Sequence, residues 1–117
     1  LGDSFVICNG LEGCLFVYSQ EEWNKFVAEL ETLPRMSKDA RIFKRYFFGS
    51  ASEGSFDKQG RVLLPQSLIR LAGIVKNIVT VGMFNRVEIW SEERWNEFVS
   101  KNSGDFDECL KTLRNKS

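Results

Sequence analysis

Histidine is absent from this sequence of 117 residues, and with it the most common catalytic base and metal ligand of proteins. Nucleophilic sites of the Ser-His-Asp and Cys-His types are therefore excluded. So are most zinc and iron centres. No cluster of cysteine, aspartate and glutamate at metal-ligand spacing takes its place, and no phosphate-binding loop is present. We therefore predict a protein that is not an enzyme and that needs no metal and no cofactor.

Long apolar runs are missing as well. No stretch approaches the roughly 20 residues needed to cross a bilayer, so we expect no membrane association. The three cysteines, Cys8, Cys14 and Cys109, contain no C-x-x-C pair, which argues against a zinc knuckle or a redox motif. Cys8 and Cys14 could face each other across a hairpin, as a disulfide or as small buried thiols in a reducing compartment. The first residue is Leu1 rather than methionine, so we expect a fragment.

The chain also lacks a surplus of either charge, because 16 basic residues balance 16 acidic ones. A strong nucleic-acid binder usually shows a basic surplus, so the balance argues mildly against one. The charges are unevenly distributed, however. Residues 1–34 carry one basic and six acidic residues, whereas residues 35–61 carry seven basic and three acidic ones. Basic charge is therefore concentrated in the middle of the chain.

An internal repeat is the most informative feature that the sequence does contain. A shift of 72 residues places residues 5–27 on residues 77–99 without a gap. Two copies predict a pseudo-symmetric pair rather than a solenoid, which needs at least three repeats. The identical pairs include Gly10/Gly82, Ser19/Ser91, Glu21/Glu93, Trp23/Trp95, Asn24/Asn96, Phe26/Phe98 and Val27/Val99.

Each copy is predicted to fold as a β-hairpin followed by an amphipathic helix. Ser19 and Ser91 stand where a helix N-cap belongs. Aromatic residues follow each cap at helical spacing, which favours core positions, with base stacking as the alternative. The predicted strands are 5–8, 14–18, 78–81 and 86–90.

The second copy has an upstream segment that the first copy lacks. Residues 52–65 are typical of a strand, an Asp-x-x-Gly turn and a second strand, and they lead into a short helix over 66–72 that Gly73 ends. The matching segment of the first copy would precede Leu1. We therefore expect the first half to be incomplete.

A basic helix is predicted between the copies, from Ser37 to Gly49. One of its faces is apolar and the other basic, and the basic face is either a solvated surface or a phosphate-contacting or inter-subunit surface. From Asp105 a short amphipathic tail helix is predicted, without an assigned role. The apolar face comprises Ile42, Phe43, Tyr46 and Phe47, and the basic face comprises Arg41, Lys44 and Arg45.

The run Asp57-Lys58-Gln59-Gly60-Arg61, followed by Val-Leu-Leu-Pro, resembles the D-x-x-x-R motif of the MraZ family, tandem relatives of the SpoVT/AbrB swapped-hairpin domain. Nearly the whole chain shares the resemblance. It implies an α+β fold, a pseudo-twofold tandem repeat of swapped-hairpin β-barrel halves, each followed by an amphipathic helix. The implied parts are an incomplete first repeat (1–34), a basic linker helix (35–50), a second repeat (51–100) and a tail helix (101–117).

The resemblance also implies a cytoplasmic, nucleoid-associated regulator of the bacterial division and cell-wall gene cluster, which binds repeated promoter boxes in double-stranded DNA as a ring-like homo-oligomer. Lys58 and Arg61 are the implied DNA contacts, with Arg41, Lys44 and Arg45 as possible further ones, while Asp57 and Gly60 are expected to brace the turn. Arg61 could instead form a buried ion pair with Asp57. The alternative function is an antitoxin-like protein-interaction module.

Overall fold

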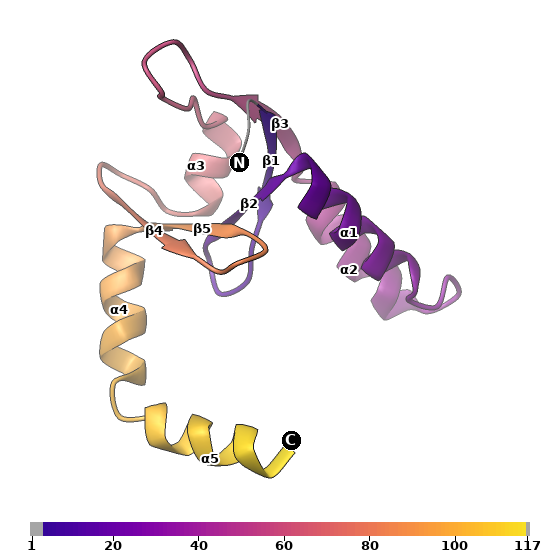
Figure 1. Cartoon of the computed structure of the whole chain (residues 1–117), viewed down its shortest axis with the longest axis vertical. Helices are drawn as coiled ribbons and strands as arrows, with labels where there is room; N and C mark the ends of the chain where they lie inside the picture. Colours follow the sequence, from indigo (N-terminus) through magenta and orange to yellow (C-terminus); the bar gives the residue numbers. More distant parts are fainter. Residues whose placement is uncertain (1–3, 117) are drawn as a thin grey trace.

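The computed structural model describes residues 4–116, which form an antiparallel sheet and a set of helices (Figure 1). The predicted α+β class is therefore confirmed. The strands are β1 (Ser4–Asn9), β2 (Leu15–Ser19), β3 (Ser52–Ser55), β4 (Ile78–Gly82) and β5 (Val87–Ser91). The helices are α1 (Gln20–Glu31), α2 (Lys38–Phe48), α3 (Gln66–Leu71), α4 (Glu92–Asn102) and α5 (Phe106–Lys116).

The two copies of the repeat share one sheet, in the order β3-β1-β2-β5-β4. The hairpin β1–β2 lies beside the hairpin β4–β5 because β2 pairs antiparallel with β5. Strand β3, which belongs to the upstream segment of the second copy, pairs with β1 of the first copy. Each copy of the repeat is therefore hydrogen-bonded to strands of the other copy. The closed swapped-hairpin barrel stays a prediction.

Both predicted hairpin–helix units are present, and both helices begin where the sequence indicates. The side-chain oxygen of Ser19 accepts a hydrogen bond of 3.1 Å from the backbone N–H of Glu22. The hydroxyl of Ser91 accepts the equivalent bond, also 3.1 Å, from the N–H of Arg94. An N-terminal helix turn has N–H groups without intrahelical partners, and these serines satisfy one each.

The prediction that the two copies match without a gap is wrong. Phe5 pairs with Ser19 in the first hairpin, whereas Ile78 pairs with Ser91 in the second. The turn of the second hairpin is therefore one residue shorter. Because a one-residue slip moves a strand residue to the other face of the sheet, Ile78 lies on the face of Phe5, although the ungapped match had paired it with Val6.

The two hairpin turns also differ in conformation. The first contains Gly10 and reverses through Glu12 and Gly13, both of which have positive φ (64° and 88°). The second reverses through Phe84, whose φ is 67°. Gly82 is the last residue of β4 rather than a turn residue. The predicted equivalence of Gly10 and Gly82 is therefore wrong as well.

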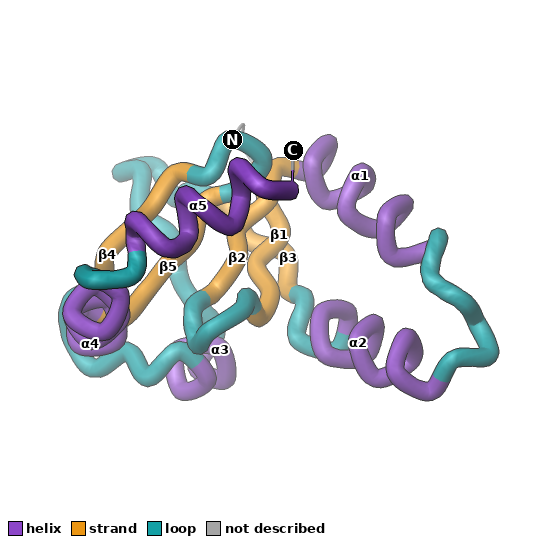
Figure 2. Tube along the Cα trace, turned by 90° about the horizontal axis from the view of Figure 1, so that it is seen from below, coloured by secondary structure: helices purple, strands orange, loops and turns teal. Residues whose placement is uncertain are grey.

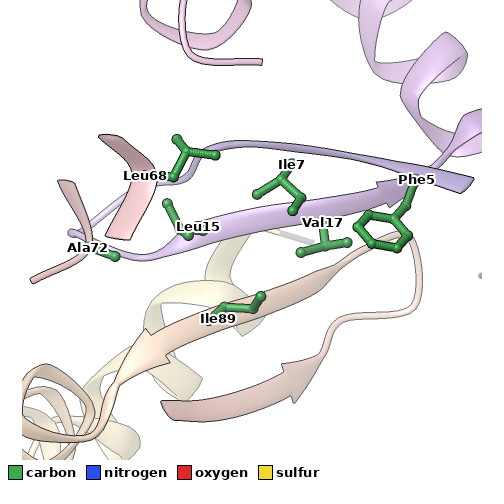
Figure 3. Close-up of a cluster of buried hydrophobic side chains, with 7 residues drawn as sticks. All are labelled: Phe5, Ile7, Leu15, Val17, Leu68, Ala72 and Ile89. Carbon is green, nitrogen blue, oxygen red and sulfur yellow. The ribbon is translucent and has the colours of Figure 1, made fainter. Parts of the chain in front are cut away.

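Each face of the sheet has its own hydrophobic core. The first core packs against α3 and is drawn in Figure 3, and its buried members are Phe5, Ile7, Leu15, Val17, Leu68, Ala72 and Ile89. The second core packs against α1, α2 and α4, and its buried members are Cys8, Cys14, Phe16, Tyr18, Leu30, Phe47 and Trp90. Trp23, Phe26, Trp95 and Phe98 pack against this second core, which confirms the core interpretation of the aromatic residues.

The upstream segment of the second copy departs from its predicted strand–turn–strand form. Its first strand is β3, but residues 61–65 form no second strand. A single antiparallel bridge, between Phe56 and Val62, closes the turn. Leu63 beyond it is 91% exposed. An extended segment forms β-sheet hydrogen bonds only with a neighbouring strand. Residues 61–65 have no such neighbour, and they lead directly into α3.

Coverage of the first core differs between its two sides. On β1, Phe5 is 2% exposed and lies 5.1 Å from the ring of Phe56, centroid to centroid. Its structural equivalent on β4, Ile78, is 45% exposed. Between them lies an apolar hollow of about 370 Å³. The edge of β4 and this hollow are thus open to solvent.

The helices project away from the sheet and give the protomer an extended shape. The pair α1–α2 extends to one side, while α4 leads away on another and carries α5 at its far end (Figures 1 and 2). The radius of gyration is 15.9 Å, compared with about 13 Å expected for a compact chain of this length. Much apolar surface therefore remains uncovered. Within residues 4–116, no helix is both long and apolar enough to cross a membrane.

Candidate nucleic-acid interface

The cationic turn (residues 57–61) lies at one end of the molecule, between β3 and α3. Its backbone closes through two bonds, from the N–H of Asp57 to the carbonyl of Arg61 (2.8 Å) and from the N–H of Gly60 to the carbonyl of Asp57 (3.0 Å). Gly60 has a φ of 78°. Glycine adopts this left-handed conformation without steric cost, so the sequence Asp-x-x-Gly folds locally into this reversal.

Asp57 holds the turn together from within. Its Oδ1 accepts hydrogen bonds from the backbone N–H groups of Gln59 (2.9 Å) and Arg61 (2.8 Å), and its Oδ2 accepts one from the Arg61 Nε (2.9 Å). These bonds, the backbone one from Arg61 first, lower the pKa of the Asp57 carboxyl below its ordinary value, since they favour the charged form. The carboxylate is therefore committed to the turn, and its negative charge is matched locally.

Arg61 keeps most of its guanidinium available. Only its Nε bonds to Asp57, and within the described residues neither terminal nitrogen has a hydrogen-bond partner. The side chain is 73% exposed. The ion pair with Asp57 thus exists, but it is not buried, so the alternative of a buried pair is wrong. What remains is an oriented planar fork of N–H donors that faces solvent.

Lys58 lies at the tip of the same turn and is exposed. In the part of the chain that the structure describes, its ammonium forms no ion pair. The turn therefore presents two cations, one fixed by its brace and one on a flexible stem. Such a pair suits an anionic partner, because planar guanidinium recognises phosphate in two-point contacts and ammonium acts as a point charge.

The other predicted basic residues are not brought to this turn. Arg41, Lys44 and Arg45 lie on α2, which leads away from the sheet on a different side from the turn (Figure 1). Arg41 and Arg45 are exposed, and Lys44 is half-buried. Arg41 donates a bond of 3.3 Å to the carbonyl of Arg35. The middle of the chain is basic in sequence, but its cations form two separate surfaces.

Two arginines with structural roles were missed by the sequence reasoning. Arg94 on α4 donates from Nη1 to the carbonyls of Gly13 (2.8 Å) and Leu71 (2.9 Å), and so connects the second copy to the first hairpin and to α3. Nothing in the sequence indicates these contacts, because they join residues 81 and 23 positions apart.

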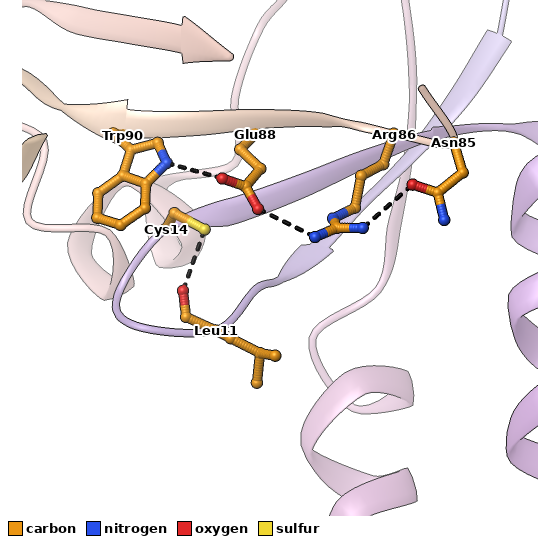
Figure 4. Close-up of polar contacts among 6 residues, drawn as sticks. All are labelled: Leu11, Cys14, Asn85, Arg86, Glu88 and Trp90. Carbon is orange, nitrogen blue, oxygen red and sulfur yellow. Dashed lines mark hydrogen bonds and ion pairs between the residues drawn. The ribbon is translucent and has the colours of Figure 1, made fainter. Parts of the chain in front are cut away.

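Arg86 is the second, and its half-buried side chain lies against the second core (Figure 4). Its Nη2 lies 3.2 Å from Oε2 of Glu88, whose Oε1 accepts a bond of 3.1 Å from the Trp90 indole N–H. The guanidinium also covers the ring of Phe16, 4.3 Å from its centroid. The i, i+2, i+4 spacing on one strand face could have indicated this group.

The cysteines carry no disulfide in the described structure. Cys8 and Cys14 are buried free thiols, and burial raises the pKa of each to about 12. Cys109 on α5 is exposed. The interpretation of Cys8 and Cys14 as small buried thiols is thus confirmed, and the alternative of a disulfide between them is wrong. Within residues 4–116, no three side chains of the metal-binding types come together.

Comparison with known proteins identifies close relatives. A family model described as "MraZ protein, putative antitoxin-like" matches residues 1–46 and again residues 47–115. The chain is 48% identical over 113 residues to "Transcriptional regulator MraZ" of Ligilactobacillus salivarius, which covers 97% of this chain and 79% of the relative. It is 50% identical to the protein of the same name from Clostridium beijerinckii, with the same coverage.

Proposed function

The chain belongs to the MraZ family, a family of transcriptional regulators rather than enzymes, and on this premise we propose that it controls transcription by binding double-stranded DNA through the cationic turn. The targets would be repeated promoter boxes of the bacterial division and cell-wall gene cluster, read by a ring-like homo-oligomer at the nucleoid. The repeats would be residues 1–34 and 51–100, joined by the basic linker at 35–50 and followed by the tail at 101–117.

The observation that carries this proposal is the free guanidinium fork of Arg61. Asp57 engages only its Nε, so that the two terminal nitrogens keep their N–H donors for a ligand. Two phosphate oxygens, or O6 and N7 of a guanine in the major groove, fit such a fork, and a good base pair contact contributes about 1–3 kcal/mol of discrimination. Lys58 beside it adds a phosphate contact, which positions the protein without reading sequence.

Oligomerisation explains how a chain of zero net charge can bind DNA. One turn with two cations binds a single site weakly, since phosphate contacts supply most of the affinity. Several turns around a ring, facing repeated boxes, raise the effective concentration and increase affinity by about 10²–10⁴-fold. The extended shape of the protomer and its uncovered apolar surface support such an assembly.

The test compares two variants: one lacks a cation of the turn, and the other lacks a cation elsewhere on the surface. A duplex is first enriched from random-sequence DNA by binding to the wild-type chain. Arg61→Ala is expected to abolish most of the binding to this duplex and to lower the dependence of log K on log salt by about one unit for each engaged turn. The control, Lys25→Ala on α1, also removes one positive charge, from an exposed ion pair. It should leave the affinity for the duplex and its salt dependence unchanged. Fluorescence anisotropy at several salt concentrations measures both quantities.

Equal binding by Arg61→Ala and the wild type would contradict the contact, provided that circular dichroism shows both to be folded. If the wild-type chain enriches no duplex at all, and a co-purified protein restores DNA binding, the alternative of an antitoxin-like interaction module gains support. The two functions are thus separated by whether the chain alone selects a DNA sequence.

A further inference from the structure

A polar hollow lies where the first copy, the linker helix α2 and the second copy meet. The end of β1, the C-terminal end of α2, the start of β3 and helix α3 form its walls, and its volume is about 650 Å³. That volume is ordinary for a small-molecule site, and such sites are common where parts of a fold meet. We call it the junction hollow. Its polar lining includes Asn9, Arg45, Ser52 and Ser67, and its apolar lining includes Pro65 and Leu71.

The walls of the junction hollow are held in place by hydrogen bonds and by packing. The hydroxyl of Ser50 accepts a bond of 2.8 Å from the backbone N–H of Asn9 and donates one of 3.0 Å to the carbonyl of Phe47. The end of β1 is thereby bonded to the end of α2. On the opposite wall, Leu68 of α3 belongs to the first core and is 1% exposed. The hollow is therefore preformed, and a ligand need not order it.

The lining carries positive charge and hydrogen-bond donors but no negative side chain. Among the described residues that line the hollow, Arg45 is the only charged one. Its guanidinium has no hydrogen-bond partner and no ion pair within residues 4–116. The side-chain amide of Asn9 and the hydroxyls of Ser52 and Ser67 are likewise without a partner in that range. All four groups can donate hydrogen bonds, which suits an anion with several acceptor oxygens.

The C-terminal end of α2 also lies at the hollow, and its carbonyl groups disfavour an anion. The helix macrodipole amounts to about half a negative charge at this end, whereas Arg45 contributes a full positive one in the same turn. The carbonyls are also engaged. That of Arg45 accepts a bond of 2.9 Å from the N–H of Gly49, and that of Phe48 accepts one of 3.3 Å from the N–H of Ala51. The balance of charge at the hollow is therefore positive.

We propose that the junction hollow binds a small phosphorylated molecule, similar in size to a nucleoside monophosphate. The Arg45 guanidinium contacts two oxygens of the phosphate group, and the amide of Asn9 and the hydroxyls of Ser52 and Ser67 donate to the others. Pro65 and Leu71 offer apolar surface to the rest of the molecule, which a bare phosphate ion would leave unused. A transcriptional regulator with this site would respond to the concentration of a phosphorylated metabolite.

A phosphate of DNA is the other source of the same chemical group. The free molecule is favoured, because the site is a hollow with walls from three parts of the chain, whereas a duplex presents its phosphates on a broad convex surface. Helix α2 also leads away from the sheet on a different side from the cationic turn (Figure 1). The inference goes beyond the proposed function and does not depend on it.

The experiment uses adenosine monophosphate as the probe, titrated into the wild-type chain by isothermal titration calorimetry. It should bind at least about tenfold more tightly than adenosine, because hydrogen bonds to a charged group contribute more than neutral ones. Inorganic phosphate should compete with it. Arg45→Gln should weaken the binding of adenosine monophosphate by about 10–100-fold. The matched control is Arg41→Gln, which removes the same charge from an exposed position of α2 outside the hollow and should change nothing.

A second pair of variants adds a negative charge instead of removing a positive one. Ser67→Asp places a carboxylate in the lining and should abolish binding of adenosine monophosphate. Gln66→Asp places the same charge on the adjacent exposed residue, outside the lining, and should leave binding unchanged. Ser67 and Arg45 are themselves exposed, so both variants are expected to fold, and circular dichroism checks this.

The proposal is overturned if the wild-type chain does not bind adenosine monophosphate, if adenosine binds equally well, or if Arg45→Gln behaves as Arg41→Gln does. It is also overturned if the enriched duplex displaces the probe and Arg45→Gln loses affinity for that duplex, because the phosphate would then belong to DNA. Failure of the proposed function is a separate result. Arg61→Ala should lose DNA and keep the probe, whereas Ser67→Asp should lose the probe and keep DNA.

Discussion

The ion pair between Arg86 and Glu88 gives the sharpest stability prediction for this chain. Its side chains are 21% and 12% exposed. Glu88 is also the acceptor for the Trp90 indole N–H, and the Nε of Arg86 has no hydrogen-bond partner among the described residues. The net free energy of such a largely buried ion pair is small, because the attraction between the two charges is offset by the cost of desolvating them. Removing one partner leaves the other charge buried and uncompensated, whereas removing both can be nearly neutral.

The magnitudes follow from this balance. Glu88→Gln keeps an acceptor for Trp90 and removes only the charge, and Arg86→Met keeps the volume and the contact with Phe16. Each single change is expected to cost about 3 kcal/mol, the lower end for breaking a buried pair because Arg86 retains some contact with water. The double variant is expected to lie within about 1 kcal/mol of the wild type. The whole chain, by the usual scaling, has about 6–17 kcal/mol of stability to lose.

Urea unfolding, followed by circular dichroism, measures these differences. All variants are compared at the same protein concentration, since assembly adds to apparent stability by mass action. The coupling energy of the double-mutant cycle then isolates the pair. If the losses of the two single variants simply add in the double variant, the pair is not coupled as the structure shows and the reasoning is refuted.

Three further predictions concern the thiols and the cationic turn. At neutral pH a thiol reagent should modify Cys109 quickly, and Cys8 and Cys14 only on unfolding, because burial raises the pKa of both to about 12; three fast thiols in the native chain would contradict this. Because the pKa of Asp57 is lowered in the folded chain, its hydrogen bonds stabilise the turn fully above about pH 4. This stabilisation is lost as the pH falls through the pKa that Asp57 has in the folded chain. An NMR titration of the turn amides should show a midpoint at that pKa, and Asp57→Asn should abolish the midpoint. Gly60→Ala should destabilise the turn by about 1–2 kcal/mol through its φ of 78° alone, since an added Cβ meets no atom within 4 Å; unchanged hydrogen exchange in the turn would rule this out.

Local chemistry explains why the candidate site was predictable. The turn needs a short side chain that accepts backbone N–H bonds and a residue that tolerates positive φ, and Asp57 and Gly60 supply these within five residues. The exposure of Arg61 was not predictable in this way. Whether its ion pair is buried depends on what packs over the turn, and in the structure the side chains of Arg61 and Asp57 stay 73% and 44% exposed.

The basic linker shows the limit of reasoning from charge along the chain. Arg41, Arg45 and Arg61 lie in one basic stretch of sequence. In the fold, however, Arg41 and Arg45 lie on α2, and Arg61 lies in the cationic turn on a different side of the sheet. The α2 face likewise reads as a single apolar stripe, but Phe47 is buried at 1% exposure while Ile42 remains at 53%. Which side of a stripe is covered depends on the neighbours that the tertiary structure provides.

The sequence by itself determined the elements of this protein: the hairpins, the serine caps, the helices behind them and the braced turn, because each depends on bonds between residues close in the chain. Only the tertiary structure decided that β3 pairs with β1, that β2 pairs with β5, and that the second hairpin is one residue tighter than the first. These depend on contacts between distant segments, whose free energy comes from burial of apolar surface that no local pattern records. For the same reason, the junction hollow became visible only in three dimensions.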